Sequence, residues 1–338
     1  MTAATDITPA SVRPDAARVP LTELEPDPSS PFDRFLVGLF ITVPLLAVAA
    51  AVPVAWRWGL GWHDVVIGLV FYVITGMGIT MGFHRHFTHT SFKAAKPLRL
   101  ALGIAGSMAI EGPVLVWVAD HRRHHKYSDK AGDPHSPWRF GTGGRALAKG
   151  FLWAHMGWLL NPVRTSQRKF CPDLLADKTV RRLSGMFPLW VGVSLLAPAV
   201  LGGLWSMSWQ GALTAFFWAS LVRVALLHHV TWSINSVCHM FGREDFQARD
   251  RSTNNAWLAI PSFGESWHNL HHADPTCARH GVLKGQVDIS ARVTRWAERI
   301  GWAWDVRWPD AQRLTPKLTP AARNRQFGSM TRNRQPAP

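Results

Sequence analysis

Cysteine, tyrosine and acidic residues are all scarce in this chain of 338 residues. Its three cysteines include no CxxC pair, which excludes a disulfide framework and a thiolate metal cluster. Only 22 Asp and Glu stand against 37 Lys and Arg, so the formal net charge is +15. The two tyrosines are outnumbered by 18 tryptophans, and tryptophan favours the boundary between lipid and water. The composition therefore indicates a membrane protein.

Four long apolar runs support this interpretation. They cover residues 35–56, 65–83, 185–204 and 209–230, and Arg223 is the only charged residue within them. Each run is long enough to cross a hydrocarbon core of about 30 Å at about 1.5 Å per helical residue. We therefore predict an all-α integral membrane protein with four transmembrane helices in two hairpins.

The distribution of charge predicts the orientation. Residues 84–184, between the two pairs of runs, carry seventeen Lys and Arg against six Asp and Glu. The positive-inside rule places this stretch and both termini in the cytoplasm. Attraction to anionic lipid headgroups is enough to explain the positive charge, so we expect no nucleic-acid partner.

Outside the spans, composition predicts tails and two smaller helices. Residues 1–30 are polar and contain five prolines, and residues 312–338 are rich in Pro, Arg and Asn. We expect both to be disordered, on either side of one membrane domain at 31–311. An apolar helix at 100–110 should lie in the interface or roof the site. An amphipathic helix at 292–300 should pack on the cytoplasmic side through Val293, Trp296 and Ile300.

Histidine, in contrast, is plentiful and patterned. Three motifs, HRHFTH, HRRHH and HNLHH, carry eight histidines, and a ninth follows Asn235 by one helical turn. In the second and third motifs the i, i+3, i+4 spacing places three imidazoles on one helix face. Neutral imidazole suits iron, zinc, copper and nickel, and nine imidazoles exceed the demand of one four-coordinate ion. The sequence therefore predicts two metals, with these candidate ligands: His84, His89, His121, His124, His125, His239, His268, His271 and His272, with Asn235 acting through a water molecule.

Acidic residues beside the motifs are candidates for orienting the imidazoles through their second ring nitrogen. They are Asp120, Asp133, Glu265 and Asp274, for which surface charge or helix capping is the alternative. His135 and His155 are candidates for the same outer set. The other histidines lack partners at ligand spacing or point away from a motif, and we do not expect them to bind metal: His63, His86, His228, His229 and His280.

A metal site at the membrane boundary is suited to a substrate with an apolar chain and a polar head. Redox-active iron can use O₂ to attack an unactivated C–H bond, which points to an oxidative enzyme. The rival from another class is a metal transporter or sensor. The ligands of a transporter would be expected inside the spans, whereas the three histidine motifs lie outside the apolar runs.

Longer stretches around the motifs resemble one family. GITMGFHR, VADHRRHHKYSD, GDPHSPW, HMGWLL and GESWHNLHHADP are similar to segments of the membrane fatty acid desaturases, above all the acyl-CoA Δ9 (stearoyl-CoA-type) group and its actinobacterial members. The resemblance covers residues 35–309. It implies a di-iron centre under a cytoplasmic cap, in a bacterial cell membrane. The nine histidines would ligate iron, with Asn235 acting through water, and Trp117, Thr231 and Trp232 would shape the acyl tunnel.

The implied reaction is O₂-dependent formation of a cis Δ9 double bond in a saturated C16 or C18 acyl-CoA. A di-iron fatty-acid hydroxylase is the alternative enzyme. The carrier is open, because Ala119 and residues 111–113 depart from the animal acyl-CoA enzymes. Basic residues that could hold carrier phosphates, or face lipid instead, are Arg122, Lys126, Arg164, Arg168 and Lys169. No cytochrome b5-like domain or flavin fingerprint is visible, so we expect a separate ferredoxin or flavoprotein reductase to supply electrons.

Overall fold

The computed structural model describes residues 23–26, 31–161, 163–328 and 330–331, and this part of the chain is mostly helical. Four helices are long and apolar enough to cross a membrane, as predicted. Their elements are α1 (Pro31–Arg57); α2 (Trp62–Met77) with η3 (Gly78–Thr88); α9 (Phe187–Ser206); and α10 (Trp209–Ala215) with η5 (Phe216–Val222), α11 (Arg223–Ser236) and η6 (Val237–His239).

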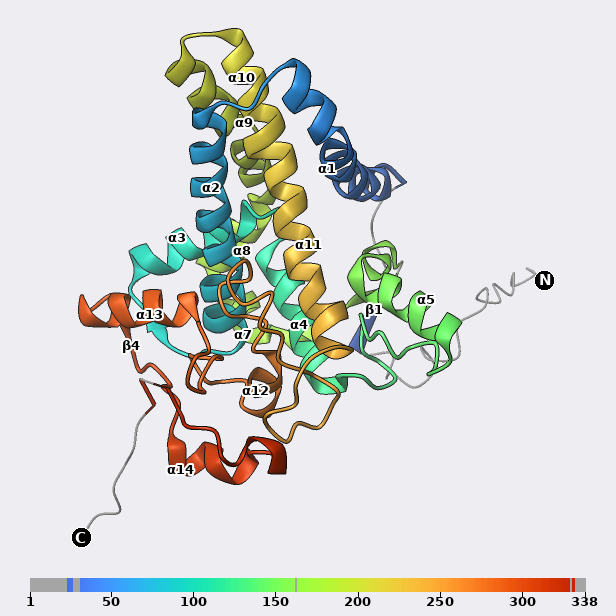
Figure 1. Ribbon diagram of the computed structural model, residues 1–338, viewed down its shortest axis with the longest axis vertical. Coiled ribbons are helices and arrows are strands. Elements are labelled where there is room, and N and C mark those ends of the chain that lie inside the picture. The colour runs from blue at the N-terminus through green and yellow to red at the C-terminus, as the bar shows by residue number, and fades with distance from the viewer. Residues whose placement is uncertain (1–22, 27–30, 162, 329, 332–338) are drawn as a thin grey trace, which may run out of the picture.

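The second and fourth of these helices are longer than predicted. They run over Trp62–Thr88 and Trp209–His239, 27 and 31 residues. At about 1.5 Å per residue each exceeds the hydrocarbon core by roughly 10 Å or more. His84 and His239 stand in the last turns of these two helices, and η3 and η6 end on the same side of the molecule as the short helices (Figure 1).

The charged residue inside the fourth helix is hydrogen-bonded both to a neighbouring helix and within its own helix. The Arg223 guanidinium is buried and donates to the Ser194 carbonyl at 3.0 Å and the Ser194 hydroxyl at 2.9 Å. Its Nε donates to the Ala219 carbonyl at 3.1 Å. These bonds to α9 and η5 explain how the apolar run tolerates a cation.

The long helices pack unequally. α9 and α10 form a close antiparallel pair, and α2 packs against both α9 and η5. α1 instead packs against η5 and α11, and it stands apart from α2 in Figure 1.

Short helices and strands gather at the end that bears the histidines. Before α9 they are α3 (Lys96–Ser107), α4 (Val114–Tyr127), α5 (Gly144–His155), η4 (Gly157–Leu160), α6 (Gln167–Phe170), α7 (Pro172–Ala176) and α8 (Lys178–Gly185). After η6 they are α12 (His268–Ala273), α13 (Ile289–Arg299), α14 (Ala311–Leu314), η7 (Thr315–Lys317) and η8 (Pro320–Ala322). α3 corresponds to the predicted helix at 100–110 and lies on η3. A Cβ at Gly78 would stand 2.1 Å from the Gly106 nitrogen, so only glycine permits this approach.

The described part of the predicted N-terminal tail is ordered, and there the prediction is wrong. β1 (Leu24–Pro26) pairs with β3 (Val163–Thr165) in an antiparallel sheet, and a second small sheet joins β2 (Lys93–Ala94) to β4 (Ala303–Trp304). The buried Glu23 carboxylate accepts hydrogen bonds from Lys126 at 2.5 Å and from Tyr127 at 2.6 Å. A strand partner and an ion pair between Glu23 and Lys126 thus order residues whose composition alone suggested a tail. Residues 1–22 and 27–30 lie outside the described part.

The predicted C-terminal tail is also ordered up to residue 328. Leu314, Leu318 and Ala322 are buried and pack with Phe246 and Leu270. These three apolar positions recur every four residues, a spacing that the basic, proline-rich composition obscured. Residues 332–338 lie outside the described part.

α13 corresponds to the predicted amphipathic helix, but its apolar face was assigned to the wrong side. Val293, Trp296 and Ile300 are exposed, at 37%, 61% and 44%. The face turned inward carries small residues instead, namely Ser290, Ala291, Thr294 and Ala297. Small side chains let the helix lie close to η3, which leaves the large apolar ones outside.

Candidate metal centre

The first histidine motif lies on a π-helix. η3 forms hydrogen bonds from residue i+5 to residue i, and the His89 amide donates to the His84 carbonyl at 3.2 Å. This ladder places residues five apart on nearly the same face, which an α-helix does not. The two rings consequently lie 4.9 Å apart between centroids.

α4 and α12 each divide their three histidines between two groups. The first metal group is His84, His89, His121, His125 and His271. The second metal group is His124, His239, His268 and His272. Within each group one ring nitrogen per residue lies within 4.8 Å of all the others. The structure therefore brings together all nine histidines that the sequence singled out.

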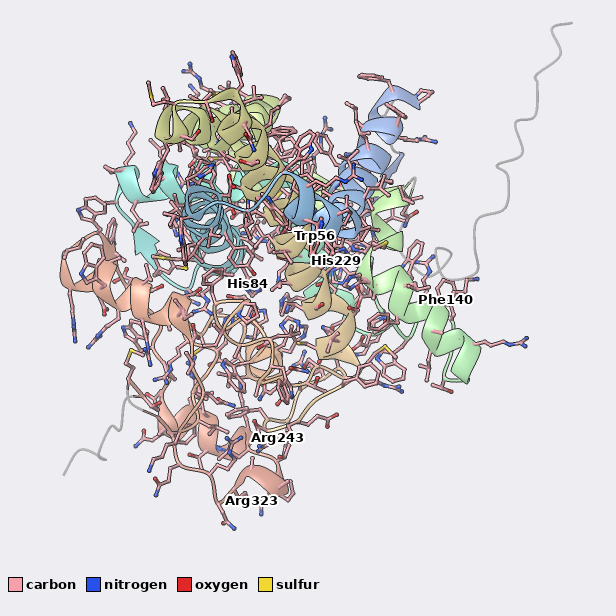
Figure 2. All side chains as sticks on the ribbon, turned by 45° about the horizontal axis from the view of Figure 1, so that its top comes forward. Trp56, His84, Phe140, His229, Arg243 and Arg323 are labelled. Atoms are coloured by element: carbon pink, nitrogen blue, oxygen red, sulfur yellow. The ribbon has the colours of Figure 1, made fainter. Side chains whose placement is uncertain are left out.

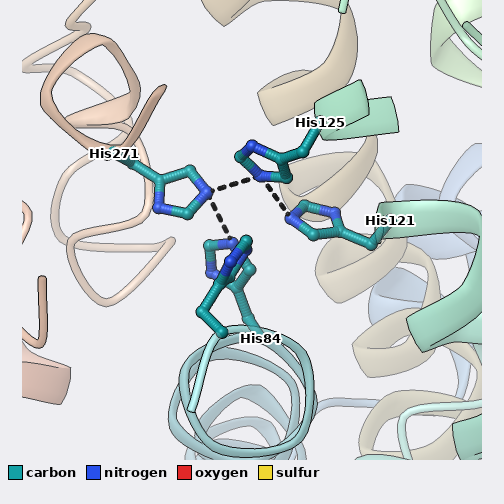
Figure 3. Close-up of side chains that lie close together, drawn as sticks. His84, His121, His125 and His271 are labelled. Atoms are coloured by element: carbon teal, nitrogen blue, oxygen red, sulfur yellow. Dashed lines mark hydrogen bonds between the residues drawn. The ribbon is translucent and has the colours of Figure 1, made fainter. Parts of the chain in front are cut away.

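The nitrogens approach closely inside each group. In the first metal group the Nε2 atom of His271 lies 3.0 Å from that of His84 and 2.8 Å from that of His125 (Figure 3). In the second metal group the Nε2 atom of His268 lies 3.2 Å from that of His239 and 3.0 Å from that of His272.

Carboxylates hold the opposite ring nitrogen of four of these histidines. Nδ1 of His124 lies 3.0 Å from Asp133, Nδ1 of His239 lies 2.9 Å from Asp129, and Nδ1 of His272 lies 2.6 Å from Asp250. Nδ1 of His84 pairs in the same way with Glu265. A carboxylate accepts the Nδ1 proton, so the Nε2 lone pair is directed into the group.

Two of the four predicted orienting carboxylates, Asp133 and Glu265, are therefore in place. The other two have different partners: Asp120 hydrogen-bonds Thr165, and Asp274 pairs with Arg313 at 2.8 Å. The prediction overlooked Asp129 and Asp250. Asp129 stands four residues after the second motif, close enough for the same reasoning to have included it. Asp250 is 22 residues from His272, and nothing in the local sequence points to it.

A buried ion network beside the first metal group was also missed. The fully buried Arg85 donates to Glu265 at 3.0 Å and to Asp288 at 3.0 Å. His280, which we expected to be isolated, lies 3.3 Å from the same Glu265 carboxylate. Arg85 offsets the charge of two buried carboxylates, so Glu265 can remain ionised next to His84.

Electrostatics keep several of the imidazoles neutral and two of the orienting carboxylates charged. Burial, reinforced by neighbouring imidazoles, lowers the pKa of His121, His125 and His268 well below its usual range. Burial alone would raise the pKa of Asp133 and Glu265, but adjacent histidines, and Arg85 at Glu265, hold it below its usual range. Neutral imidazole is the form that binds a metal ion.

These residues fit two metal ions. Where four Nδ1 atoms face carboxylates, the converging Nε2 atoms carry lone pairs and cannot satisfy one another by hydrogen bonds. Nε2 of His89 and Nε2 of His124 are buried without a hydrogen-bond partner, although each lies in one of the groups. Cations between the nitrogens satisfy both observations, and an all-imidazole set suits iron among the first-row metals.

Asn235 is half-buried near the end of α11, one turn before His239. Its action through a water molecule stays a prediction. The other histidines lie as follows. His135 stacks on His124 at 4.3 Å, His155 and His229 contact each other at 2.9 Å, His86 faces the Phe92 carbonyl, His228 the Ala109 carbonyl, and His63 pairs with Asp64.

One of the three predicted tunnel residues, Trp117, lies next to the first metal group. Trp117 stacks on His121, with centroids 4.9 Å apart, and its Nε1 donates to Glu111 at 3.2 Å. Burial raises the pKa of Glu111 to about 7, against the effect of hydrogen bonds from Thr231 and Trp117. Thr231 also lines a small, mostly apolar cavity between α2, η3, α11 and residues 261–265. Trp232 instead packs against His228, at 5.0 Å between centroids.

Two of the residues proposed to hold phosphate form ion pairs with acidic residues of the chain itself. Arg122 donates to Asp173 at 2.6 and 3.0 Å and to the Phe87 and Phe170 carbonyls at 3.0 Å. Lys126 pairs with Glu23. Both side chains therefore tie segments together rather than stand open for a ligand.

A family model described as fatty acid desaturase matches residues 57–286, which include every histidine of both metal groups. The chain belongs to the fatty acid desaturase family. It is 36% identical over 281 residues to the hex-5-enoyl-(acyl-carrier protein) acetylenase of Moorena producens (strain JHB), covering 82% of this chain and 88% of that protein. It is 37% identical over 253 residues to the sn-1 stearoyl-lipid 9-desaturase of Anabaena variabilis, covering 74% and 86%. It is 36% identical over 254 residues to delta-9 acyl-lipid desaturase 1 of Arabidopsis thaliana, covering 73% and 76%.

Membership confirms that this desaturase is an oxidoreductase of lipid metabolism, in a membrane-bound family known for di-iron centres. The narrower resemblance to actinobacterial acyl-CoA enzymes stays a prediction.

Proposed function

We propose that this desaturase uses O₂ to introduce a cis double bond at C9 of a saturated C16 or C18 acyl chain, in the synthesis of unsaturated fatty acids. One observation supports the proposal most directly. The first metal group lies beside a small apolar cavity of about 20 Å³ between the second and fourth membrane-spanning helices. Glu265 lines this cavity and also pairs with His84. An acyl chain entering between these helices would pass next to the metal ligands.

The nine histidines would hold two irons, with Asn235 acting through a water molecule. Bound iron supplies the oxidising power that removes hydrogen from an unactivated C–H bond with O₂. The protein's own residues bind and orient the chain. Apolar walls exclude water, and the contacts among Trp117, Glu111 and Thr231 fix the shape of the passage beside His121.

The metal-bearing end would face the cytoplasm of a bacterial cell, as a cap on the four spans with both termini on that side. The positive charge of residues 84–184 supports this orientation. Electrons would come from a separate ferredoxin or flavoprotein reductase. The carrier that the sequence favours is coenzyme A, while the relatives compared above are named for lipid-linked and acyl-carrier-protein-linked chains.

The test is the lipid profile of a desaturase-deficient host that expresses the chain, with double bonds located by mass spectrometry. Parallel cultures carry His124→Ala, which removes one residue of the second metal group, and His63→Ala, a histidine remote from both groups. We expect new C16 or C18 chains with a double bond at C9 in the wild type and in His63→Ala, and none in His124→Ala.

Hydroxylated chains would assign the protein to the hydroxylases instead. A bond at another carbon would correct the position, and no new product from an expressed, iron-loaded protein with a supplied reductase would overturn the proposal. Membranes given labelled stearoyl-CoA, stearoyl-acyl carrier protein or stearoyl-lipid would then identify the carrier by which pool acquires the double bond.

A further inference from the structure

A strongly basic surface lies at the end of the molecule away from the membrane-spanning helices. Residues 311–328 contain four Lys or Arg and no Asp or Glu. Residues 243–247 lie against them, because Phe246 pairs with Leu318 and the Thr319 amide donates to the Asp245 carbonyl at 3.0 Å. We call the surface of these two segments the basic pole, and its cations are Arg243, Arg313, Lys317, Arg323 and Arg325.

The cations of the basic pole are held in place. Buried Asp245 pairs with both Arg243 and Arg325 at 3.0 Å, and buried Asp274 pairs with Arg313 at 2.8 Å. Asp245 and Asp274 are recessed, whereas the Arg243 side chain is 64% exposed and that of Arg313 is 42% exposed. Glu244 is the exposed acidic residue of the two segments, against five cations. The surface offered to solvent is therefore positive.

Lipid headgroups do not explain this charge. In Figure 1 α14 lies at the end opposite the turn between α9 and α10, and Figure 2 shows Arg243 and Arg323 near each other and far from Trp56. With the four spans in a bilayer, the basic pole faces water rather than the membrane surface. A soluble partner with a negative face is the complement that such a surface fits.

The basic pole also lies directly over the metal-bearing helix α12. Leu270 of α12 packs in one apolar cluster with Leu314 and Leu318 of the pole. The Lys317 ammonium donates to the Ala273 carbonyl at 2.6 Å, and Ala273 follows His272 of the second metal group. One hydrogen bond and one peptide unit thus separate the surface from a metal-group histidine.

Desaturation needs electrons from outside the reaction. Forming one double bond removes two hydrogen atoms from the chain and reduces one O₂ to two water molecules. Reducing one O₂ to two water molecules takes four electrons and four protons. The acyl chain supplies two of each, so two more electrons and two more protons must be delivered. Within the part of the chain that the structure describes, no domain carries an electron-transfer cofactor fold.

We propose that the basic pole docks a soluble one-electron carrier with an acidic face, such as an iron–sulfur ferredoxin, and that its electrons enter through α12 beside His272. This inference rests on the proposed oxidative function. The carrier docks once for each of the two electrons, so binding must be rapid and reversible, as long-range attraction between opposite charges allows.

The test measures binding of a purified acidic [2Fe–2S] ferredoxin to the full-length protein in detergent, as a function of salt. The double variant Arg243→Glu, Arg323→Glu reverses two exposed charges of the basic pole. Its matched control, Arg292→Glu, Arg299→Glu, makes the same change of net charge at exposed positions on α13. We expect the pole variant to bind about tenfold more weakly or worse, mainly through slower association, and with a smaller salt dependence. The control should bind as the wild type does.

Turnover supplies a second readout. We expect the pole variant to show a lower ratio of ferredoxin-driven to chemically driven desaturation than the wild type, with dithionite and methyl viologen as the chemical electron source. Wild-type affinity in the pole variant, or equal weakening in both variants, would overturn the docking surface. If the wild type binds ferredoxin but forms no product with either electron source, the proposed function is overturned instead. The docking surface would then be judged only by the ferredoxin affinity of the two variants.

Discussion

Asp250→Asn should weaken metal binding at one of the two groups. Asp250 is buried, with 6% of its side chain exposed, and its Oδ2 lies 2.6 Å from Nδ1 of His272. Burial would raise the pKa of this carboxyl, but the hydrogen bond from His272 holds it below its usual range. Asparagine keeps the shape and one acceptor but removes the charge that fixes the imidazole tautomer.

The expected loss follows from that contact. Changing a carboxylate that orients a metal-binding histidine costs about 10- to 100-fold in metal affinity, which is roughly 1.4 to 2.7 kcal/mol. Asp250 contacts a residue of the second metal group only. We therefore expect one of two bound irons to be lost at a lower chelator concentration, while the other is retained as in the wild type.

The assay is iron content per protein after equilibration with graded chelator, with Asp274→Asn as the control. Asp274 is similarly buried and stands near the same motif, but it pairs with Arg313. Its variant should follow the wild-type curve. Equal retention by Asp250→Asn and the wild type, or equal loss in both variants, would refute the argument that the carboxylate acts through His272.

Three further predictions concern stability and product. Metal-free protein should melt at a lower temperature at pH 5.5 than at pH 7.5. Its buried histidines have a lowered pKa, so below about pH 6.5 the unfolded chain binds more protons than the folded one. The free energy of unfolding then falls by up to about 1.4 kcal/mol per pH unit for each histidine. A melting temperature that is independent of pH would contradict this. Gly76→Ala should cost about 1–3 kcal/mol of unfolding free energy, because its Cβ would stand 2.2 Å from the Phe263 ring, while Gly185→Ala meets open space and should melt as the wild type does. Trp117→Leu removes the bond to Glu111 and the stacking on His121, and should broaden the chain lengths and bond positions of the product; an unchanged product profile by mass spectrometry would remove Trp117 from the passage.

The histidine motifs were readable because imidazoles at i, i+3 and i+4 stay together on any helix. The sequence did not show which histidine of a motif belongs to which metal group. His121 and His125 turn to one group and His124 to the other, since a helix lying between two ions presents neighbouring residues to different sides. The i+5 spacing of His84 and His89 makes sense only on a π-helix, and spacing alone does not predict one.

The carboxylates that contact the histidines could likewise be predicted only in part from the sequence. Asp133 and Glu265 were found because they flank the motifs, but flanking is a weak guide to contact. Asp120 and Asp274 flank them equally and face elsewhere, and Asp250 reaches His272 only through the folding of the intervening loop. α13 shows the same limit. Helical periodicity located the helix, but which of its faces is buried depended on how closely α13 can approach η3.

The placement of α12 has a consequence for the order of biogenesis. Both metal groups draw residues from α12, and the other contributors are the ends of two membrane helices and α4. On a ribosome all three of these segments are synthesised before residue 268, and the second membrane helix and α4 are made well before it. Until then neither group is complete, so the membrane helices must hold their positions without help from a bound ion. Loading of iron would then be a late event that fastens the chain from residue 268 onward to helices that were made before it.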